Sequence, residues 1–396
     1  MIRFSLLSNH AIKVGLSGLI LGGLLSAGLH AGFAQGYSKP GKSSPAPQLG
    51  NSGVGKPIFQ ESQGSRPYNM AFSPDGHKLA VALASGAIRI YAVPPDLKLD
   101  LKLQISKSTA SIFGIAFNHN GRALAVSLSD GSVLLYQVSG LASGRTPRTI
   151  QAANGKYASA VAFHPTQDLL AVSSQDGSVK VWDVSKLFED RANQPQSVTR
   201  YTSAHSKPAL NLAFSPDGSY LASASADTFV TLSKGADKEK QPKPLTGHKQ
   251  QVNWLAFSPD GETLVSAGAD SVILWDYRHG KSLQTLAPSN GHESARTVSF
   301  GRGVSEGIVA VGYKEGTITL FDLNLHTQKT IMSPGPEVSA VSFSPDGALL
   351  AAATYADQLA VWRVNDLLGS APGVPQHPEP GRGSDLKTTF PKPGKK

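Results

Sequence analysis

Hydrophobic and polar positions along the chain repeat seven times in the same order. Each repeat has an apolar stretch that ends in Phe, a polar turn, a stretch of Ala, Leu, Val and Ser, a second short turn, and a β-branched or aromatic stretch. Successive landmark phenylalanines are on average about 45 residues apart. Four strands of about five or six residues fill such a repeat, so the pattern predicts seven four-stranded sheets. The landmarks are Phe72, Phe117, Phe163, Phe214, Phe257, Phe300 and Phe343.

The turn after the landmark phenylalanine has the sequence Ser-Pro-Asp-Gly in four repeats. Pro fixes φ where a type I turn requires it, and Gly tolerates the positive φ that follows. We therefore interpret these segments as hairpin turns and not as sites of catalytic aspartates. They are Ser73–Gly76, Ser215–Gly218, Ser258–Gly261 and Ser344–Gly347.

One repeat carries a full set of landmarks that belong to a known family. It runs from Gly247-His248 through Ser266 and Asp270 to Trp275-Asp276, and Trp182-Asp183 ends a second good half-repeat. On these residues the chain resembles the WD40-repeat family of β-propellers. Within that family it resembles the bacterial-type exported WD-repeat proteins. The other repeats depart from the family pattern at the aromatic position that ends the repeat.

The resemblance implies an all-β fold, a seven-bladed β-propeller over residues 57–369. The seventh repeat runs into Gly and Pro after Trp362 and has no outer strand of its own, whereas Lys56–Glu61 precedes the first repeat without a partner. We expect this N-terminal strand to pair with the last blade, because closing the ring removes two exposed sheet edges.

His248, Ser266 and Asp270 have the residue types of a serine hydrolase. A nucleophilic serine needs a strained elbow and an oxyanion hole, and no G-x-S-x-G motif surrounds Ser266. The resemblance implies instead that these three side chains and Trp275 form a buried hydrogen-bonded tetrad, so no catalytic residue is expected. A second set lacks the tryptophan, which Ser233 replaces: His205, Ser223 and Asp227.

The two ends of the chain differ from the repeats. Residues 1–34 have Arg3 and Lys13 before an uncharged apolar run that ends in small residues, which is typical of a cleaved export signal. An uncleaved membrane anchor is the alternative, since the run approaches the roughly 20 residues that cross a bilayer. Residues 35–56 and 370–396 are rich in Pro, Gly, Ser and Lys, and we expect a flexible linker and a disordered basic tail.

The net charge of +9 resides almost entirely in these end segments. The nearly neutral body lacks the clustered Lys and Arg that neutralise phosphates, so we expect no specific nucleic-acid binding. The chain has no Cys, which excludes disulfides, thiolate metal sites and a catalytic thiol. It also has no phosphate loop, dinucleotide motif or cluster of metal ligands, so we expect no metal and no cofactor.

Binding residues of a propeller lie on loops that a rigid scaffold holds in place. The resemblance places the positions six and four residues before each landmark phenylalanine on the narrow face. Several of these are aromatic or Arg, the residue types that dominate interface energetics. We predict partner contacts here, with Arg296 across the channel from the aromatic group. The candidates are Arg66, Tyr68, Phe113, Tyr157, Leu210, Asn253 and Arg296.

Three classes of function remain open. The first, which the phased repeats favour, is an exported, periplasmic or secreted scaffold without catalytic activity. It would be a monomer that binds a protein or peptide and meets no membrane beyond its N-terminal segment. The second is a propeller enzyme of lactonase or quinone-dependent dehydrogenase type, which needs ligands at the channel, where Ala, Val, Ile and Leu prevail. The third is a TolB-like periplasmic translocation component, which lacks the spacing from His248 to Trp275.

Overall fold

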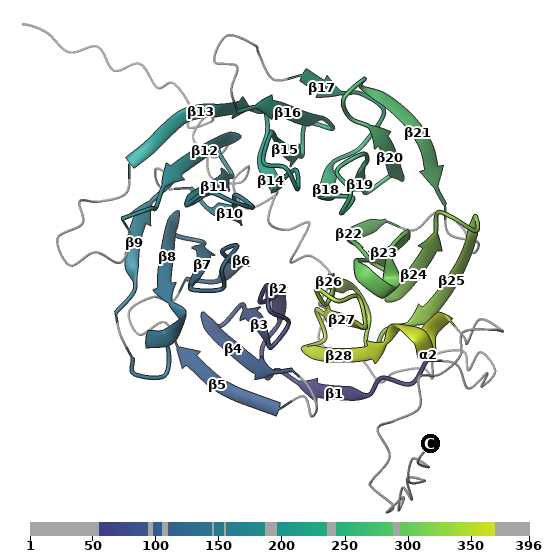
Figure 1. Cartoon of the computed structure of the whole chain (residues 1–396), viewed down its shortest axis with the longest axis horizontal. Coiled ribbons are helices and arrows are strands. Elements are labelled where there is room, and N and C mark those ends of the chain that lie inside the picture. The colour runs from purple at the N-terminus through teal and green to yellow at the C-terminus, as the bar shows by residue number, and fades with distance from the viewer. Residues whose placement is uncertain are drawn as a thin grey trace, which may run out of the picture. The chain divides into compact units, whose positions relative to one another are not determined.

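The structure is a computed structural model that describes residues 55–93, 98–104, 110–144, 146–153, 156–186, 196–235, 243–287 and 294–368. These residues form seven four-stranded antiparallel sheets, arranged as blades around a common axis (Figure 1). The predicted all-β fold with seven propeller blades is therefore confirmed. The predicted export signal, tail and all but the last two residues of the predicted linker lie outside the described residues and stay predictions.

The innermost strand of every blade ends at one of the landmark phenylalanines. Successive side chains of a strand point to opposite faces of its sheet, so each inner strand packs against both neighbouring blades. The inner strands are β2 (Pro67–Phe72), β6 (Ile112–Phe117), β10 (Ala158–Phe163), β14 (Ala209–Phe214), β18 (Val252–Phe257), β22 (Ala295–Phe300) and β26 (Val338–Phe343).

The second strand of every blade consists mainly of small and β-branched residues. In β7, β11, β19 and β23 every position is buried, because a blade covers each face of the strand. The second strands are β3 (Lys78–Leu83), β7 (Ala123–Leu128), β11 (Leu169–Ser174), β15 (Tyr220–Ser225), β19 (Leu264–Gly268), β23 (Ile308–Tyr313) and β27 (Leu349–Thr354).

The third strand carries an aromatic side chain at one fixed register position in six of the seven blades. In blade five, Leu264 pairs with Phe257 on one side and with Trp275 on the other. The corresponding residues are Tyr91, Tyr136, Trp182, Ser233, Trp275, Phe321 and Trp362. The third strands are β4 (Ala87–Ala92), β8 (Ser132–Gln137), β12 (Ser178–Asp183), β16 (Val230–Lys234), β20 (Val272–Asp276), β24 (Thr317–Asp322) and β28 (Gln358–Arg363).

The outer strand of the seventh blade comes from the opposite end of the sequence. Strand β1 (Phe59–Ser62) pairs antiparallel with β28, with Phe59 opposite Val361 and Ser62 opposite Gln358. This pairing confirms the predicted closure of the ring. The other outer strands are β5 (Lys98–Gln104), β9 (Arg148–Gln151), β13 (Gln196–Ala204), β17 (Lys243–Leu245), β21 (Lys281–Leu286) and β25 (Thr327–Met332). The short helices are η1 (Val138–Gly140), η2 (Gly303–Ser305) and α2 (Val364–Leu368).

Side chains tie the closing strand to the first blade as well as to the last. The Tyr91 hydroxyl donates to Glu61 Oε2 at 2.8 Å, and Gln63 Nε2 donates to the Tyr91 hydroxyl at 2.9 Å. Arg89 pairs with Glu61 at 3.5 Å, and the rings of Phe59 and Tyr91 meet edge to face with centroids 5.6 Å apart. The closing strand therefore holds both blades at the seam of the ring.

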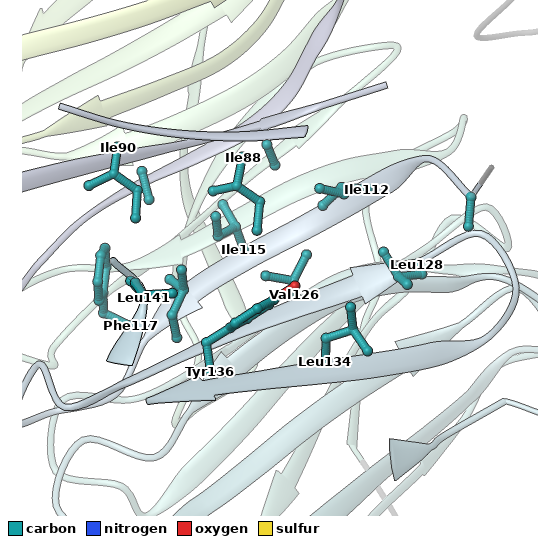
Figure 2. Close-up of a cluster of buried hydrophobic side chains, with 14 residues drawn as sticks. Ile88, Ile90, Ile112, Ile115, Phe117, Val126, Leu128, Leu134, Tyr136 and Leu141 are labelled. Atoms are coloured by element: carbon teal, nitrogen blue, oxygen red, sulfur yellow. The ribbon is translucent and has the colours of Figure 1, made fainter. Parts of the chain in front are cut away.

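The hydrophobic core consists of seven clusters, one between each pair of neighbouring blades. Figure 2 shows the cluster between blades one and two, where Ile88 and Ile90 of β4 face Ile115 of β6 and Val126 of β7. Burial of one such side chain contributes about 1.5–3 kcal/mol relative to its exposure. Because every cluster draws on two blades, a single blade cannot bury its own faces.

The Ser-Pro-Asp-Gly segments form hairpin turns, as predicted. In all four, the Ser hydroxyl donates to the Asp carboxylate and the Gly N–H donates to the Ser carbonyl. The glycines have φ between +71° and +73°, a region that glycine adopts without strain. Burial opposes ionisation of Asp217, but hydrogen bonds from Ser215 and Ser219 lower the pKa of its carboxyl to about 2. These aspartates are therefore partners within their own turns.

Candidate interaction face

The seven inner strands begin on one face of the propeller, and we keep the name narrow face for it. Each inner strand pairs with the second strand with a register shift at the same place, four residues before the landmark phenylalanine. Such a β-bulge leaves one residue outside the ladder and re-aims its side chain. The seven bulged residues are Tyr68, Phe113, Ser159, Leu210, Asn253, Arg296 and Ser339.

One backbone hydrogen bond recurs beside the bulge in all seven blades. The carbonyl six residues before the landmark accepts from the N–H of the first residue in the turn between the second and third strands, at 2.8–3.0 Å. The narrow face therefore also carries this turn residue, which the sequence analysis did not consider. The accepting residues are Arg66, Ser111, Tyr157, Pro208, Gln251, Ser294 and Glu337, and their donors are Ala84, Ser129, Gln175, Ala226, Ala269, Lys314 and Tyr355.

Four aromatic rings from four neighbouring blades lie in series on this face, and we call them the aromatic row. The ring centroids of Tyr68 and Phe113 are 5.4 Å apart, those of Phe113 and Tyr157 5.6 Å, and those of Tyr68 and Tyr355 5.8 Å. The structure thus brings together three predicted residues and adds Tyr355. Its signal in the sequence is a turn position that holds Ala, Ser, Gln or Lys in the other six repeats.

The rings of the aromatic row are half-buried, and none of them belongs to the seven core clusters of the described residues. Their planes meet at angles of 37°, 55° and 73°. Tilted aromatic pairs of this kind contribute about 0.5–1.5 kcal/mol each beyond the burial of their area. The ring contacts therefore order the row while each of the four residues keeps part of its surface accessible.

Charged groups surround the end of the row at Tyr68 and Tyr355. Burial raises the pKa of Tyr68 above its usual value, and the Arg66 guanidinium opposes this rise. Burial also raises the pKa of Tyr355, with Arg296 opposing the rise and Glu337 adding to it. Both phenols therefore stay protonated at neutral pH and can donate hydrogen bonds.

Two of the predicted contact residues are buried and bonded within the protein, and their role in partner binding stays a prediction. Arg296 is 8% exposed, and its Nη2 pairs with Glu337 Oε1 at 2.8 Å. Asn253 is 6% exposed, and its Nδ2 donates to the Ala295 carbonyl at 2.7 Å. At both positions the bulge directs a polar side chain toward the next blade. Arg296 accordingly stands beside the row, while Leu210, half-buried in blade four, stays a predicted contact.

Glu337 has a backbone φ of +58°, a left-handed value that is uncommon for residues other than glycine. Such a conformation costs of order 1–3 kcal/mol and is held only where surrounding contacts determine it. Here the Glu337 carbonyl accepts from Tyr355 N–H while its carboxylate pairs with Arg296. The strained residue therefore fixes one end of the aromatic row.

Blade five contains a continuous hydrogen-bonded chain of four side chains. Asp270 Oδ1 lies 2.9 Å from His248 Nδ1, His248 Nε2 lies 2.7 Å from Ser266 Oγ, and Trp275 Nε1 donates to Ser266 Oγ at 2.8 Å. The Ser266 hydroxyl therefore donates to His248 Nε2, and the imidazole carries its proton on Nδ1. Burial lowers the pKa of His248, although Asp270 opposes the shift. Because Ser266 is 0% exposed, a substrate carbonyl cannot approach its oxygen.

Blade four has the same arrangement without the indole. His205 Nδ1 lies 3.0 Å from Asp227 Oδ2, and His205 Nε2 lies 2.8 Å from Ser223 Oγ. Ser233 takes the register position that Trp275 has in blade five. Burial lowers the pKa of His205 too, against the opposing Asp227 carboxylate. The His–Ser–Asp geometry thus does not depend on the tryptophan.

Two further kinds of site concern the described part of the chain, a metal site and a membrane span. Within it, no group of three or more His, Asp or Glu side chains is placed to hold a metal ion. No helix in the same residues has the length and apolar character to span a bilayer. The apolar run within residues 1–34, the alternative membrane anchor, lies outside them.

Comparison with protein families agrees with this architecture. The family model described as WD domain, G-beta repeat matches residues 144–183, 196–232, 239–276 and 326–363. No curated protein matches the chain significantly. With four matched repeats and seven propeller blades, the chain belongs to the WD40-repeat β-propeller family. Propellers of this family generally serve as scaffolds for protein interactions.

Proposed function

We propose that this protein is an exported, non-catalytic scaffold that binds a protein partner through the aromatic row and Arg66. The observation that carries the proposal is the series of four half-buried rings on the narrow face. The rings stand near the starts of three inner strands and on one turn, all of which the blades hold rigidly, and binding residues are often placed on such rigidly supported positions. The four residues lie outside the core clusters and keep part of their surface accessible, which favours a role in contact with a partner.

The chemistry of the row suits a protein interface. Tyr side chains supply a large contact area with few rotatable bonds, so little conformational entropy is lost on binding. Contacts among the rings order the row before a partner arrives, which lowers the cost of association. Arg66 adds a guanidinium, another side chain that is enriched among energetically dominant interface residues.

The proposed absence of catalysis is supported by the blade-five tetrad. Each polar group of Ser266 and His248 already has a partner inside the blade. A fluorophosphonate probe, which labels activated serines covalently, tests this part directly. We expect no label on Ser266, and labelling there would overturn the non-catalytic assignment.

The proposed export rests on the charged start, apolar run and small-residue exit of residues 1–34. Expression of the full chain in a bacterial host, followed by fractionation and N-terminal sequencing, tests it. We expect a mature chain that starts near Gln35 and leaves the cytoplasm. A protein that keeps residues 1–34 and sediments with membranes would support the anchor instead.

The interaction site is tested by affinity capture with the mature protein as bait. We expect the double variant Tyr68→Ala with Phe113→Ala to lose its captured partners, because an anchor residue can contribute 2 kcal/mol or more, about thirtyfold in affinity. Phe229→Ala is the matched control, since Phe229 is an aromatic residue, 38% exposed, outside the row.

A second bait lacks residues 370–396 and separates the row from the basic tail. Any contribution of the tail is electrostatic and fades at high salt, where the Debye length falls to about 3 Å at 1 M. If the double variant captures the same partners as the wild type and tail deletion abolishes capture at every salt concentration, the narrow face is not the site.

A further inference from the structure

We propose that the aromatic row binds an extended, proline-containing acidic segment of the partner protein. This inference rests on the proposed function and adds the chemistry of the segment that the site takes. Three features of the row support it: the tilt of its rings, its length and the charges at its ends.

The tilt of the rings favours peptide side chains over flat ligands. Neighbouring planes in the row meet at 37°, 55° and 73°, so the rings form notches and not one flat platform. A sugar ring that stacks on an aromatic side chain needs a ring presented face on. A pyrrolidine ring or another compact side chain can fill the notch between two tilted rings, as in aromatic-lined grooves that bind Pro-rich segments.

The length of the row suits a short extended segment. The three centroid distances of 5.8, 5.4 and 5.6 Å limit the row to at most about 17 Å. At a rise of about 3.1 Å per residue, a polyproline II segment of five or six residues covers this span. Such a segment is already extended before binding, and its solvated carbonyls can accept a hydrogen bond from the protonated phenol of Tyr68.

The charges at the two ends of the row favour an acidic segment. Arg66 lies near Tyr68 and Tyr355, and the exposed Lys156 precedes Tyr157 at the far end. Arg has five N–H donors, so Arg66 can keep bonds within the protein and still donate to a carboxylate.

The acidic side chains around the row have partners of their own. Glu337 pairs with Arg296, and Asp130 and Asp176 accept hydrogen bonds from serines within their turns. These hydrogen bonds hold the two aspartates in their turns without removing their charge, so the attraction of an acidic segment comes from Arg66 and Lys156. A partner with carboxylates near both ends of the row complements these two cations.

Fluorescence anisotropy with labelled synthetic peptides tests this chemistry on the mature wild-type protein. The probes are a Pro-rich peptide with Asp at both ends, the same peptide with Ala for Pro, and the same peptide with Lys for Asp. A soluble N-acetylglucosamine oligomer competes for the site as the glycan arm. We expect the acidic Pro-rich peptide to bind at least tenfold more tightly than either altered peptide, and the oligomer not to displace it.

Single variants separate the contributions of the rings and the charge. Tyr68→Ala should weaken binding of the acidic peptide at least tenfold, and Arg66→Gln should weaken it at low salt while flattening its salt dependence. The matched controls are Phe229→Ala and Arg122→Gln, two exposed residues outside the row, and both should bind as the wild type does.

Equal binding of the Ala or Lys peptides, or displacement by the glycan oligomer, would overturn the proposed chemistry. If no peptide binds while partner capture still depends on Tyr68 and Phe113, the acidic proline segment is wrong and the interaction site stands. If capture does not depend on the row at all, the proposed function itself fails.

Discussion

The tetrad of blade five and the aromatic row differ in whether their side chains are satisfied inside the protein or remain accessible to a partner. In the tetrad, every polar atom that could react finds a partner inside the blade, and Trp275 is 1% exposed. In the row, the rings contact one another across blades and the residues stay half-buried. A side chain that is satisfied internally stabilises the fold, whereas accessible apolar surface on a rigid support is available to a partner.

The largest effect on stability is expected from Trp275→Ala. It removes a buried ring from the core between blades four and five and strips Ser266 of its indole donor, so unfolding should become easier by about 3–5 kcal/mol. Urea denaturation measures this loss. Trp182→Ala, at the same register position but half-buried, serves as the comparison and should cost less. Equal losses of unfolding free energy for the two variants would contradict a larger stabilising contribution of the tetrad tryptophan.

A smaller effect is expected from Ser266→Ala, which leaves the Trp275 N–H and the His248 nitrogen without their shared partner. Removing a buried hydrogen-bond partner costs about 1–3 kcal/mol, so we expect a loss of that order. Ser223→Ala in blade four should cost less because no indole N–H is stranded there. Urea denaturation of both variants compares the blades, and a larger loss for Ser223→Ala would reverse the ranking.

A graded effect of pH is expected from the two buried histidines. Burial lowers the pKa of His205 and His248 below the usual 6.5, so the unfolded chain takes up their protons more readily than the folded one. Stability should be complete above pH 6.5 and decline as the pH falls below it. Urea midpoints between about pH 5 and 8 measure how stability changes with pH. Carboxylates with lowered pKa do not contribute in this range, because they take up protons only at more acidic pH.

The contribution of His248 to the pH dependence of stability can be isolated by substitution. His248→Gln should flatten this slope, whereas His77→Gln, in an exposed turn of blade one, should leave it unchanged. An unchanged slope in the His248 variant would assign the pH dependence to other groups.

The smallest effect on stability is expected from Tyr157→Ala at the end of the aromatic row. One ring pair, with Phe113, is lost from a half-buried position, so the loss should be about 0.5–1.5 kcal/mol. Binding of the acidic peptide should nevertheless weaken, which separates the row from the tetrad in function. A stability loss as large as that of Trp275→Ala would instead make Tyr157 a core residue.

Much of the fold could be predicted because each blade is formed by residues that lie close together in one repeat. The seven landmark phenylalanines, the turn residues and the apolar patterns recur in phase, and each blade follows from its own segment. The closing strand could also be predicted, since the seventh repeat lacks an outer strand and Lys56–Glu61 lacks a partner. The spacing from His248 to Trp275 likewise lies within one repeat.

The interaction face was only partly predictable, because its contacts cross from blade to blade. Tyr68, Phe113 and Tyr157 stand at positions that a single repeat identifies, but their mutual contacts require the register of neighbouring blades. Tyr355 was missed, since it approaches Tyr68 only when the last blade closes against the first.

The sequence by itself determined the number of blades, their turns and the His–Ser–Asp–Trp spacing, because these depend on residues close together in the chain. Only the tertiary structure decided which side chains of the narrow face are exposed and which are bonded to the next blade. A bulge at the same place in every blade re-aims one residue, and contacts with the neighbouring blade determine whether its side chain is buried. Arg296 pairs with Glu337 and is buried, whereas Tyr68 contacts other rings and stays partly accessible. A pattern within one repeat contains no information about that neighbour, which is why burial on this face could not be predicted from it.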